Sequence, residues 1–218
     1  MYNPPHFEET RPEELERIII EYPLGTLVYC APDGLDAAHL PFIYKKEQGP
    51  KGTLIAHVAR KNVIWQQVAN GTEVLTLFHG SNSYISPNWY PSKHETHRQV
   101  PTWNYQVVHI HGRIRFIEDT KFLRSLVALL TQIHETRAAE AKPWKMSDGD
   151  KDYIEQQLAS IVGLEIDVTR IVGKSKLSQN REPRDRDGAI AALRRRGEIA
   201  TADAMERTQP PLGNVAPT

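Results

Sequence analysis

The sequence has a single cysteine, no long apolar run and no excess of charge of either sign. Cys30 alone excludes an intrachain disulfide, and its apolar neighbours indicate a buried, unreactive thiol. The 218 residues include 27 Lys and Arg against 27 Asp and Glu, so no global field attracts nucleic acid. No apolar segment approaches the roughly 20 residues of a membrane span, and the first residues lack the basic and apolar regions of a signal peptide. These absences predict a soluble, cytoplasmic protein without contact to a membrane.

Several catalytic motifs are also missing. The chain contains no G-x-G-x-x-G turn, no P-loop and no G-x-S-x-G elbow. His94 and His97 are one residue too close for the H-E-x-x-H spacing of zinc proteases. His109 and His111 share a strand face and could ligate one ion, but further ligands are not identifiable. We therefore expect no metal, and interpret these histidines as pocket-lining or hydrogen-bonded groups.

Residues 83–112 form the most unusual segment of the chain. They combine aromatic residues, prolines and four histidines, which makes the segment too polar for core and too aromatic for an ordinary loop. This mixture predicts a ligand pocket lined by Trp89, Tyr90, Trp103, His94, His97, His109 and His111. His39 and His57, each flanked by apolar residues, are expected to be structural histidines with satisfied hydrogen bonds.

Hydrophobic periodicity and turn residues predict a mainly β protein with flanking helices, an α+β arrangement. Strands are expected at 24–31, 35–46, 53–59, 73–80, 105–117 and 163–174, and helices at 10–22, 63–68, 119–134, 147–161 and 187–196. Thr10 with Glu13 predicts a capping box for the first helix, and Ser147 a cap for the fourth. Because most strands follow one another through tight turns such as Pro32-Asp33-Gly34, we expect an antiparallel barrel.

The expected domain organisation is one large domain with a C-terminal appendage. Residues 1–173 would form the barrel with its helices, residues 174–207 a charged helical extension, and residues 208–218 a disordered tail. Arg194, Arg195 and Arg196 could contact DNA phosphates from the extension. Because interspersed carboxylates nearly cancel their charge, a solvated helix is the competing interpretation.

Arg60, Lys61 and Asn62 follow a strand and open a short helix. Backbone amides and two cations could meet an anion there, since helix N-termini attract phosphate. A solvated basic turn is the alternative.

Seven segments closely resemble, in the right order, the PaiB family of FMN-binding negative transcriptional regulators. They are MYNPPHF at 1–7, LPF at 40–42, HVARKN at 57–62, YISPNWYPSK at 84–93, VPTWNY at 100–105, VHIHG at 108–112 and KLSQNR at 176–181. The resemblance covers residues 1–207 and implies an antiparallel split β-barrel similar to pyridoxamine phosphate oxidase and the flavin reductases. It also implies a homodimer with FMN at the subunit interface.

The resemblance further implies roles for individual residues. Arg60 and Lys61 would approach the FMN phosphate, with Asn62 capping the helix. His39, Leu40 and Pro41 would pass near the isoalloxazine ring, and Trp103, Asn104 and Tyr105 would approach it from a later strand. The arginine-rich, phosphate-gripping strand of the oxidases is replaced here by DAAHLPFIYKK. Fewer cations imply weaker FMN binding or another ligand in this pocket.

Three functions remain open from the sequence. The first is a dimeric, FMN-binding negative regulator of transcription that contacts DNA directly or through a partner. The second is a flavin-dependent reductase or oxidase, in which the protein holds the ring and FMN performs the redox chemistry. The third, suggested by the histidines alone, is a haem-binding or metal-binding split barrel.

Overall fold

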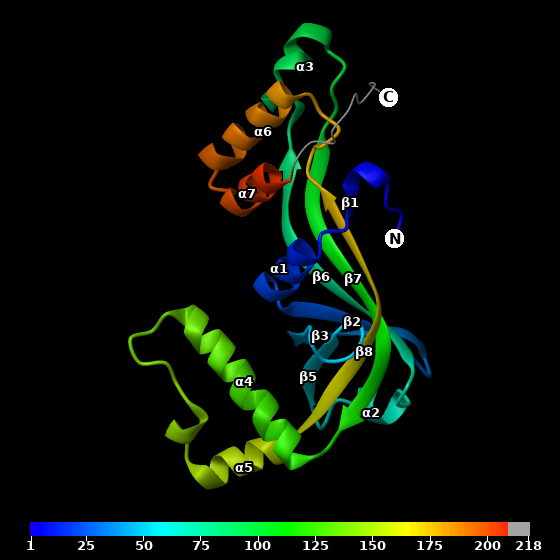
Figure 1. Ribbon diagram of the computed structural model, residues 1–218, viewed down its shortest axis with the longest axis vertical. Helices are drawn as coiled ribbons and strands as arrows, with labels where there is room; N and C mark the ends of the chain where they lie inside the picture. The colour runs from blue at the N-terminus through cyan, green and yellow to red at the C-terminus, as the bar shows by residue number, and fades with distance from the viewer. Residues whose placement is uncertain (209–218) are drawn as a thin grey trace. The chain divides into compact units, whose positions relative to one another are not determined.

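The computed structural model describes residues 1–208 and divides into two compact units (Figure 1). The barrel unit comprises Pro23–Leu77 and His109–Ile171, and the terminal unit comprises Met1–Tyr22, Phe78–Val108 and Val172–Thr218. Three long strands, β6 (Glu73–Ile85), β7 (Thr102–Ile117) and β8 (Ile161–Lys176), contribute to both. The tail expected to be disordered, 208–218, lies outside the described residues apart from Thr208.

The barrel unit is built on an antiparallel sheet that curls back on itself. Its other strands are β2 (Leu24–Ala31), β3 (Gly34–Pro41), β4 (Ile43–Lys45) and β5 (Thr53–Ala59). The sheet order is β3-β2-β6-β7-β8-β5-β4, so β3 and β4 end the path. Only Phe42 separates these two strands in the chain. Because the path begins and ends at neighbouring residues, the sheet must close, and the predicted mainly β fold with flanking helices is confirmed.

The hairpin predicted at Pro32-Asp33-Gly34 is confirmed. The β2–β3 register runs from Ala31 opposite Gly34 to Leu24 opposite Pro41. Gly34 has φ +123°, a value that L side chains rarely adopt, so glycine meets a conformational requirement of this turn.

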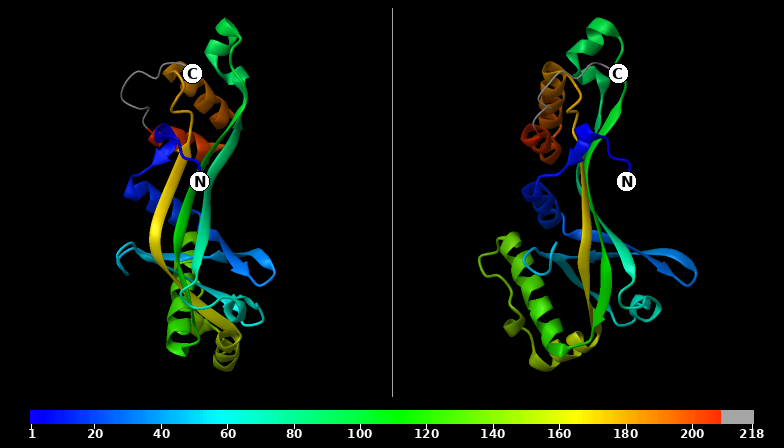
Figure 2. Two further views of the ribbon diagram at one scale, coloured as in Figure 1. Left: turned by 90° about the vertical axis from the view of Figure 1, so that its right-hand side faces the viewer. Right: turned by 45° about the vertical axis from the view of Figure 1, so that its right-hand side comes forward.

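On one side of the barrel unit lie α4 (Thr120–Ala138), the 3-10 helix η3 (Met146–Asp148) and α5 (Lys151–Ala159) (Figure 2). The short helix α2 (Ile64–Gln67) lies on the other side of the strands. Leu126 and Leu130 of α4 pack against Ile43 and Ile55, as expected from the apolar stripe of this helix. The cap predicted at Ser147 is wrong: Asp150 caps α5 by accepting a hydrogen bond from the Tyr153 amide at 2.9 Å.

The terminal unit combines its portions of the three long strands with short elements. They are η1 (Pro5–Phe7), β1 (Glu8–Glu9), α1 (Pro12–Glu21), η2 (Pro87–Trp89), α3 (Pro91–Thr96), α6 (Pro183–Arg195) and α7 (Ile199–Arg207). The pair α6 and α7 lies side by side (Figures 1 and 2) and shares a core with the strands through Ile85, Leu177, Leu193 and Met205. Helix α6 begins four residues earlier than predicted, and α7 was not predicted. No helix of residues 1–208 is long and apolar enough to cross a membrane.

Three local predictions are wrong. Arg11, not Thr10, is the N-cap of α1 and makes no side-chain cap; its amide and guanidinium instead bond the Glu9 carboxylate. Cys30 is exposed, because it lies near the hairpin tip opposite Leu35, which is 78% exposed. The His57 Nδ1 atom is buried and has no hydrogen-bond partner among the described residues, and burial lowers the pKa of this histidine.

Candidate functional site

The corner between β5 and α2 holds the two cations expected to meet a phosphate. The Arg60 guanidinium donates to the carbonyl oxygens of Ala159 at 2.9 Å and Ile161 at 3.2 Å, and pairs with the Glu118 carboxylate at 2.5 Å. Its carbon also lies 5.6 Å from the centre of the Trp65 ring. The hydrogen bonds of the Arg60 guanidinium therefore connect the β5–α2 corner to the start of β8.

Lys61 has a different environment, although it is the next residue. Its side chain is exposed, and it forms no ion pair within residues 1–208. Asn62 accepts a hydrogen bond from the Ile64 amide at 3.1 Å, and the Trp65 indole donates to the Arg60 carbonyl at 3.0 Å, so the backbone around Lys61 is fixed. An exposed ammonium without an ion pair, on a backbone held by hydrogen bonds, is suited to a charge-assisted hydrogen bond with a phosphate such as that of FMN. Of the two cations, Lys61 is therefore the one whose charge is available to an anion, because the donors of Arg60 are already bonded.

Strand β3 presents its predicted site residues on alternating faces. His39 is exposed, and its Nδ1 lies 3.1 Å from the Thr26 hydroxyl on β2. Leu40 is buried at 9% exposure, and Pro41 is half-buried opposite Leu24. Only His39 of the three is thus both polar and accessible on the outer face.

The outer face of β3, β2 and β6 is apolar around this histidine. In register, His39 lies opposite Thr26 and Thr26 opposite Leu77, while Val28 lies opposite Leu75. The side chains of Val28, Leu75 and Leu77 are half-buried. We call Thr26, Val28, His39, Leu75 and Leu77 the outer sheet patch; it can shield a flat apolar ring or a second protein surface.

The segment Trp103 to Tyr105, in the terminal unit, also alternates between faces. Trp103 is 52% exposed; its indole donates to Asn82 Oδ1 at 3.2 Å and lies 6.2 Å from the ring of Tyr84. Tyr105 shares this face by alternation. Asn104 points the other way, is fully buried, and donates to the Ser178 hydroxyl at 3.0 Å and the Met205 sulfur at 3.4 Å. Its amide belongs to the core beneath α7.

The predicted pocket histidines fall into both units. In the terminal unit, His94 Nε2 lies 3.4 Å from the Asn88 carbonyl, and His97 ends α3 with φ 56°. Trp89 of η2 is half-buried. The guanidinium carbon of Arg196 lies over the indole of Trp89, 5.8 Å from the ring centre.

His109 and His111 belong to the barrel unit. His111 Nε2 lies 2.9 Å from Arg170, and burial, followed by the charge of Arg170, lowers the pKa of His111. Within residues 1–208, no three His, Cys, Asp or Glu side chains are grouped to hold a metal.

The three arginines proposed for DNA contact are unequal. Arg194 pairs with Asp203 and Glu206 of α7, each at 2.8 Å, and Arg196 pairs with Glu198 at 2.8 Å. Arg195 is exposed and forms no ion pair within the described part of the chain. The available positive charge of this cluster therefore centres on Arg195.

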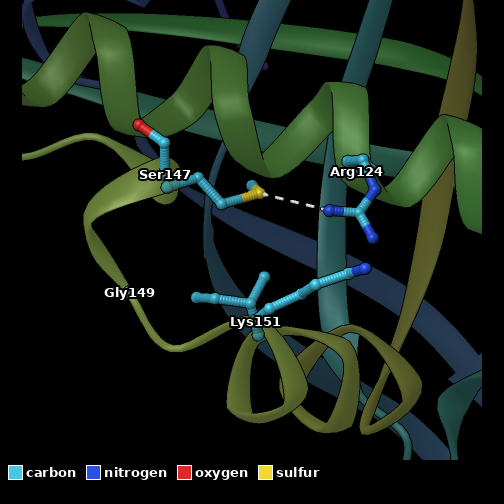
Figure 3. Close-up of a pocket in the computed structure, with 6 residues that line it drawn as sticks. Arg124, Ser147, Gly149 and Lys151 are labelled. Atoms are coloured by element: carbon cyan, nitrogen blue, oxygen red, sulfur yellow. Dashed lines mark hydrogen bonds between the residues drawn. The ribbon is translucent and has the colours of Figure 1, made fainter.

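A pocket between α4, η3 and α5 was missed in the sequence (Figure 3). It has a volume of about 380 Å³, and its lining includes Arg124, Met146 and Lys151. Arg124 lies 3.9 Å from the Met146 sulfur and pairs with Glu155. Its residues are close only because η3 folds back onto α4, and no local pattern indicates that return.

Comparisons with known proteins identify the family of this chain. Residues 1–170 match the family model described as "Putative FMN-binding domain". The chain is 32% identical over 193 residues to the Protease synthase and sporulation protein PAI 2 of Bacillus subtilis, covering 88% of this chain and 89% of that protein. It is 35% identical to the Saccharomyces cerevisiae protein YKL070W, covering 65% of this chain and 95% of the yeast protein.

Solved structures show the same fold at low sequence identity. A conserved hypothetical protein of Mycobacterium tuberculosis, Rv2991, is 13% identical with a TM-score of 0.56, covering 81% of this chain and 91% of its own. An FAD and heme binding protein of Mycobacterium smegmatis is 17% identical with a TM-score of 0.53. The match covers 85% of this chain and 79% of the mycobacterial chain. The chain belongs to the PaiB family of FMN-binding split-barrel proteins, with FMN as the cofactor that the family implies.

Proposed function

We propose that the protein is a homodimeric, FMN-binding negative regulator of transcription. The observation that carries the flavin site is the unpaired Lys61 ammonium on a corner braced by Arg60. Lys61 would hold the phosphate, and His39 with the apolar part of the outer sheet patch would flank the ring. Bound FMN supplies a redox-active isoalloxazine ring. The protein's own residues bind it, orient it and exclude water from one side.

The homodimer is supported by the outer sheet patch. A row of half-buried aliphatic side chains in the middle of a sheet is costly to leave in water, and a second copy of the same face can cover it. A flavin at such an interface would be enclosed by both subunits. This arrangement follows from the family resemblance, and the patch is the surface of this chain that suits it.

Leu75→Glu is expected to convert the dimer to a monomer. A carboxylate in the middle of an apolar interface loses solvation without gaining a partner, whereas in the monomer the half-exposed position tolerates it. Light scattering coupled to gel filtration measures the mass directly. Tyr153→Glu, which adds the same charge to a side chain 57% exposed on α5, is the control. If both variants remain dimers, the outer sheet patch is not the interface.

The regulatory role is supported by the name of the Bacillus subtilis relative, which refers to protease synthase and sporulation. DNA contact would involve the unpaired Arg195 more than Arg194 or Arg196. We expect Arg195→Ala to weaken binding to a regulated promoter fragment and to lower the slope of log K against log salt by about 0.9. Arg194→Ala should have a smaller effect, since its charge already faces Asp203 and Glu206.

Filter binding or fluorescence anisotropy at several salt concentrations checks this prediction. If Arg195→Ala and Arg194→Ala lose the same amount of DNA affinity, the ion pairs of Arg194 do not decide which arginine contacts DNA. A protein that binds no DNA, bleaches its flavin with NADH or NADPH and turns over an electron acceptor would instead be an oxidoreductase, and the regulator proposal would fail.

A further inference from the structure

Two lysines of the terminal unit, Lys174 and Lys176, have no carboxylate partner within residues 1–208, although the first is buried and the second half-buried. Lys174 is 7% exposed and Lys176 is half-buried; they are two residues apart on β8, so their side chains share a face about 6.6 Å apart along the strand. Lysine is almost never buried without a pairing partner, because removing an ammonium from water is costly. The described part of the chain therefore contains an uncompensated pair of positive charges.

The Lys174 ammonium contacts neutral groups. Its ammonium donates to the Tyr2 carbonyl at 3.0 Å and lies 5.7 Å from the Tyr2 ring and 5.6 Å from the Tyr105 ring. Glu8 is opposite Lys174 in the β1–β8 register, but its side chain is exposed and forms no ion pair with it. Glu9, the other acid of β1, is occupied by Arg11.

Lys176 is also held by neutral groups. Its ammonium donates to the Trp103 carbonyl at 2.6 Å and to the Thr102 hydroxyl, and lies 5.8 Å from the Phe7 ring. Burial, followed by the positive charges of Arg181 and Lys174, lowers the pKa of Lys176. Arg181 donates to the Gln99 side-chain oxygen at 2.8 Å and also has no carboxylate partner in the part of the chain that the structure describes. A third cation thus adds to the same positive field.

Three sequence motifs that the flavin proposal leaves largely unused meet at these lysines. MYNPPHF supplies Tyr2 and Phe7, VPTWNY supplies Thr102 and Trp103, and KLSQNR supplies Lys176 and Arg181. The exposed Trp103 and Tyr84 rings lie beside one another, 6.2 Å apart. Cations beside accessible aromatic rings provide both charge and a stacking surface.

We propose that Lys174 and Lys176 form a binding site for an oxyanion, the phosphate or carboxylate of a small molecule other than FMN, whose remaining part packs on Trp103. The anion compensates the two ammonium groups, and Arg181 strengthens the attraction. Tyr2 and Phe7 place the N-terminal segment over the site.

The test measures the melting temperature of the FMN-saturated, full-length protein in sodium phosphate or sodium succinate, against sodium chloride of equal ionic strength. A ligand that binds only the folded state is expected to raise the melting temperature by roughly 5–10 °C at about one hundred times its Kd. Phosphate and succinate distinguish the two oxyanion sources. No rise in either salt beyond that in chloride would overturn the proposal.

Lys176→Gln removes the charge and keeps a hydrogen-bond donor toward Thr102 and Trp103. We expect it to abolish the anion-dependent rise, whereas Lys93→Met, which removes a lysine of α3 in the same unit, should preserve it. Lys174→Gln replaces the first variant if that one does not fold. A full rise in the glutamine variant would refute the site. If the anions stabilise only the flavin-free protein, they occupy the place of FMN's own phosphate, and the proposal of a second ligand is overturned. Loss of FMN binding in Lys61→Ala tests the flavin site alone and does not bear on the anion site.

Discussion

Lys61→Ala is expected to weaken FMN binding roughly 10- to 100-fold. A charge-assisted hydrogen bond to phosphate contributes about 1.5–3 kcal/mol, and each 1.4 kcal/mol is a factor of ten in Kd. Lys61 has no ion pair within residues 1–208, so its removal costs the fold little and the loss should appear in affinity. Quenching of flavin fluorescence during a titration measures it. Lys121→Ala, an exposed lysine of α4, is the matched control.

Arg60→Ala separates the two adjacent cations. Its guanidinium bonds the Ala159 and Ile161 carbonyls, so its removal should lower the free energy of unfolding by about 2 kcal/mol. Flavin affinity should fall less than in Lys61→Ala. The reverse pattern, with a stable Arg60→Ala protein that loses FMN and an unaffected Lys61→Ala protein, would assign the phosphate to Arg60 and contradict our proposal.

Gly188→Ala is expected to destabilise the terminal unit by about 2–3 kcal/mol, although alanine ordinarily favours a helix interior over glycine by about 1 kcal/mol. A Cβ at this position of α6 would lie 2.2 Å from the Trp89 carbonyl oxygen and 3.3 Å from Pro91 Cδ. A backbone oxygen cannot rotate away as the end of a flexible side chain can. Helix α6 or η2 must therefore shift.

Urea unfolding of Gly188→Ala and the wild type measures this change. Ala191→Gly, at an exposed position of the same helix, is the control and should cost only the propensity difference of about 1 kcal/mol. An equally stable or more stable Gly188→Ala protein would show that α6 does not pack against η2 at this distance.

Local patterns predicted much of the barrel. The β2–β3 hairpin follows from strand alternation and the positive φ required at Gly34, and the apolar stripe of α4 indicated the face that meets Ile55. Helix caps were less predictable, because several polar residues precede each helix. Asp150, rather than Ser147, caps α5 because the backbone path places its carboxylate at the Tyr153 amide.

By itself, the sequence determined the class of fold, the family and the two cations at the β5–α2 corner. Periodicity and turn residues act locally, and the seven ordered motifs identify the family without any coordinates. Only the tertiary structure distinguished Arg60 from Lys61 and directed Asn104 into the core. It also left Lys174 and Lys176 without a carboxylate partner among residues 1–208. Adjacent residues of like charge appear equivalent in a sequence. Their roles differ because partners such as Ala159, almost one hundred residues away, are brought close only by folding.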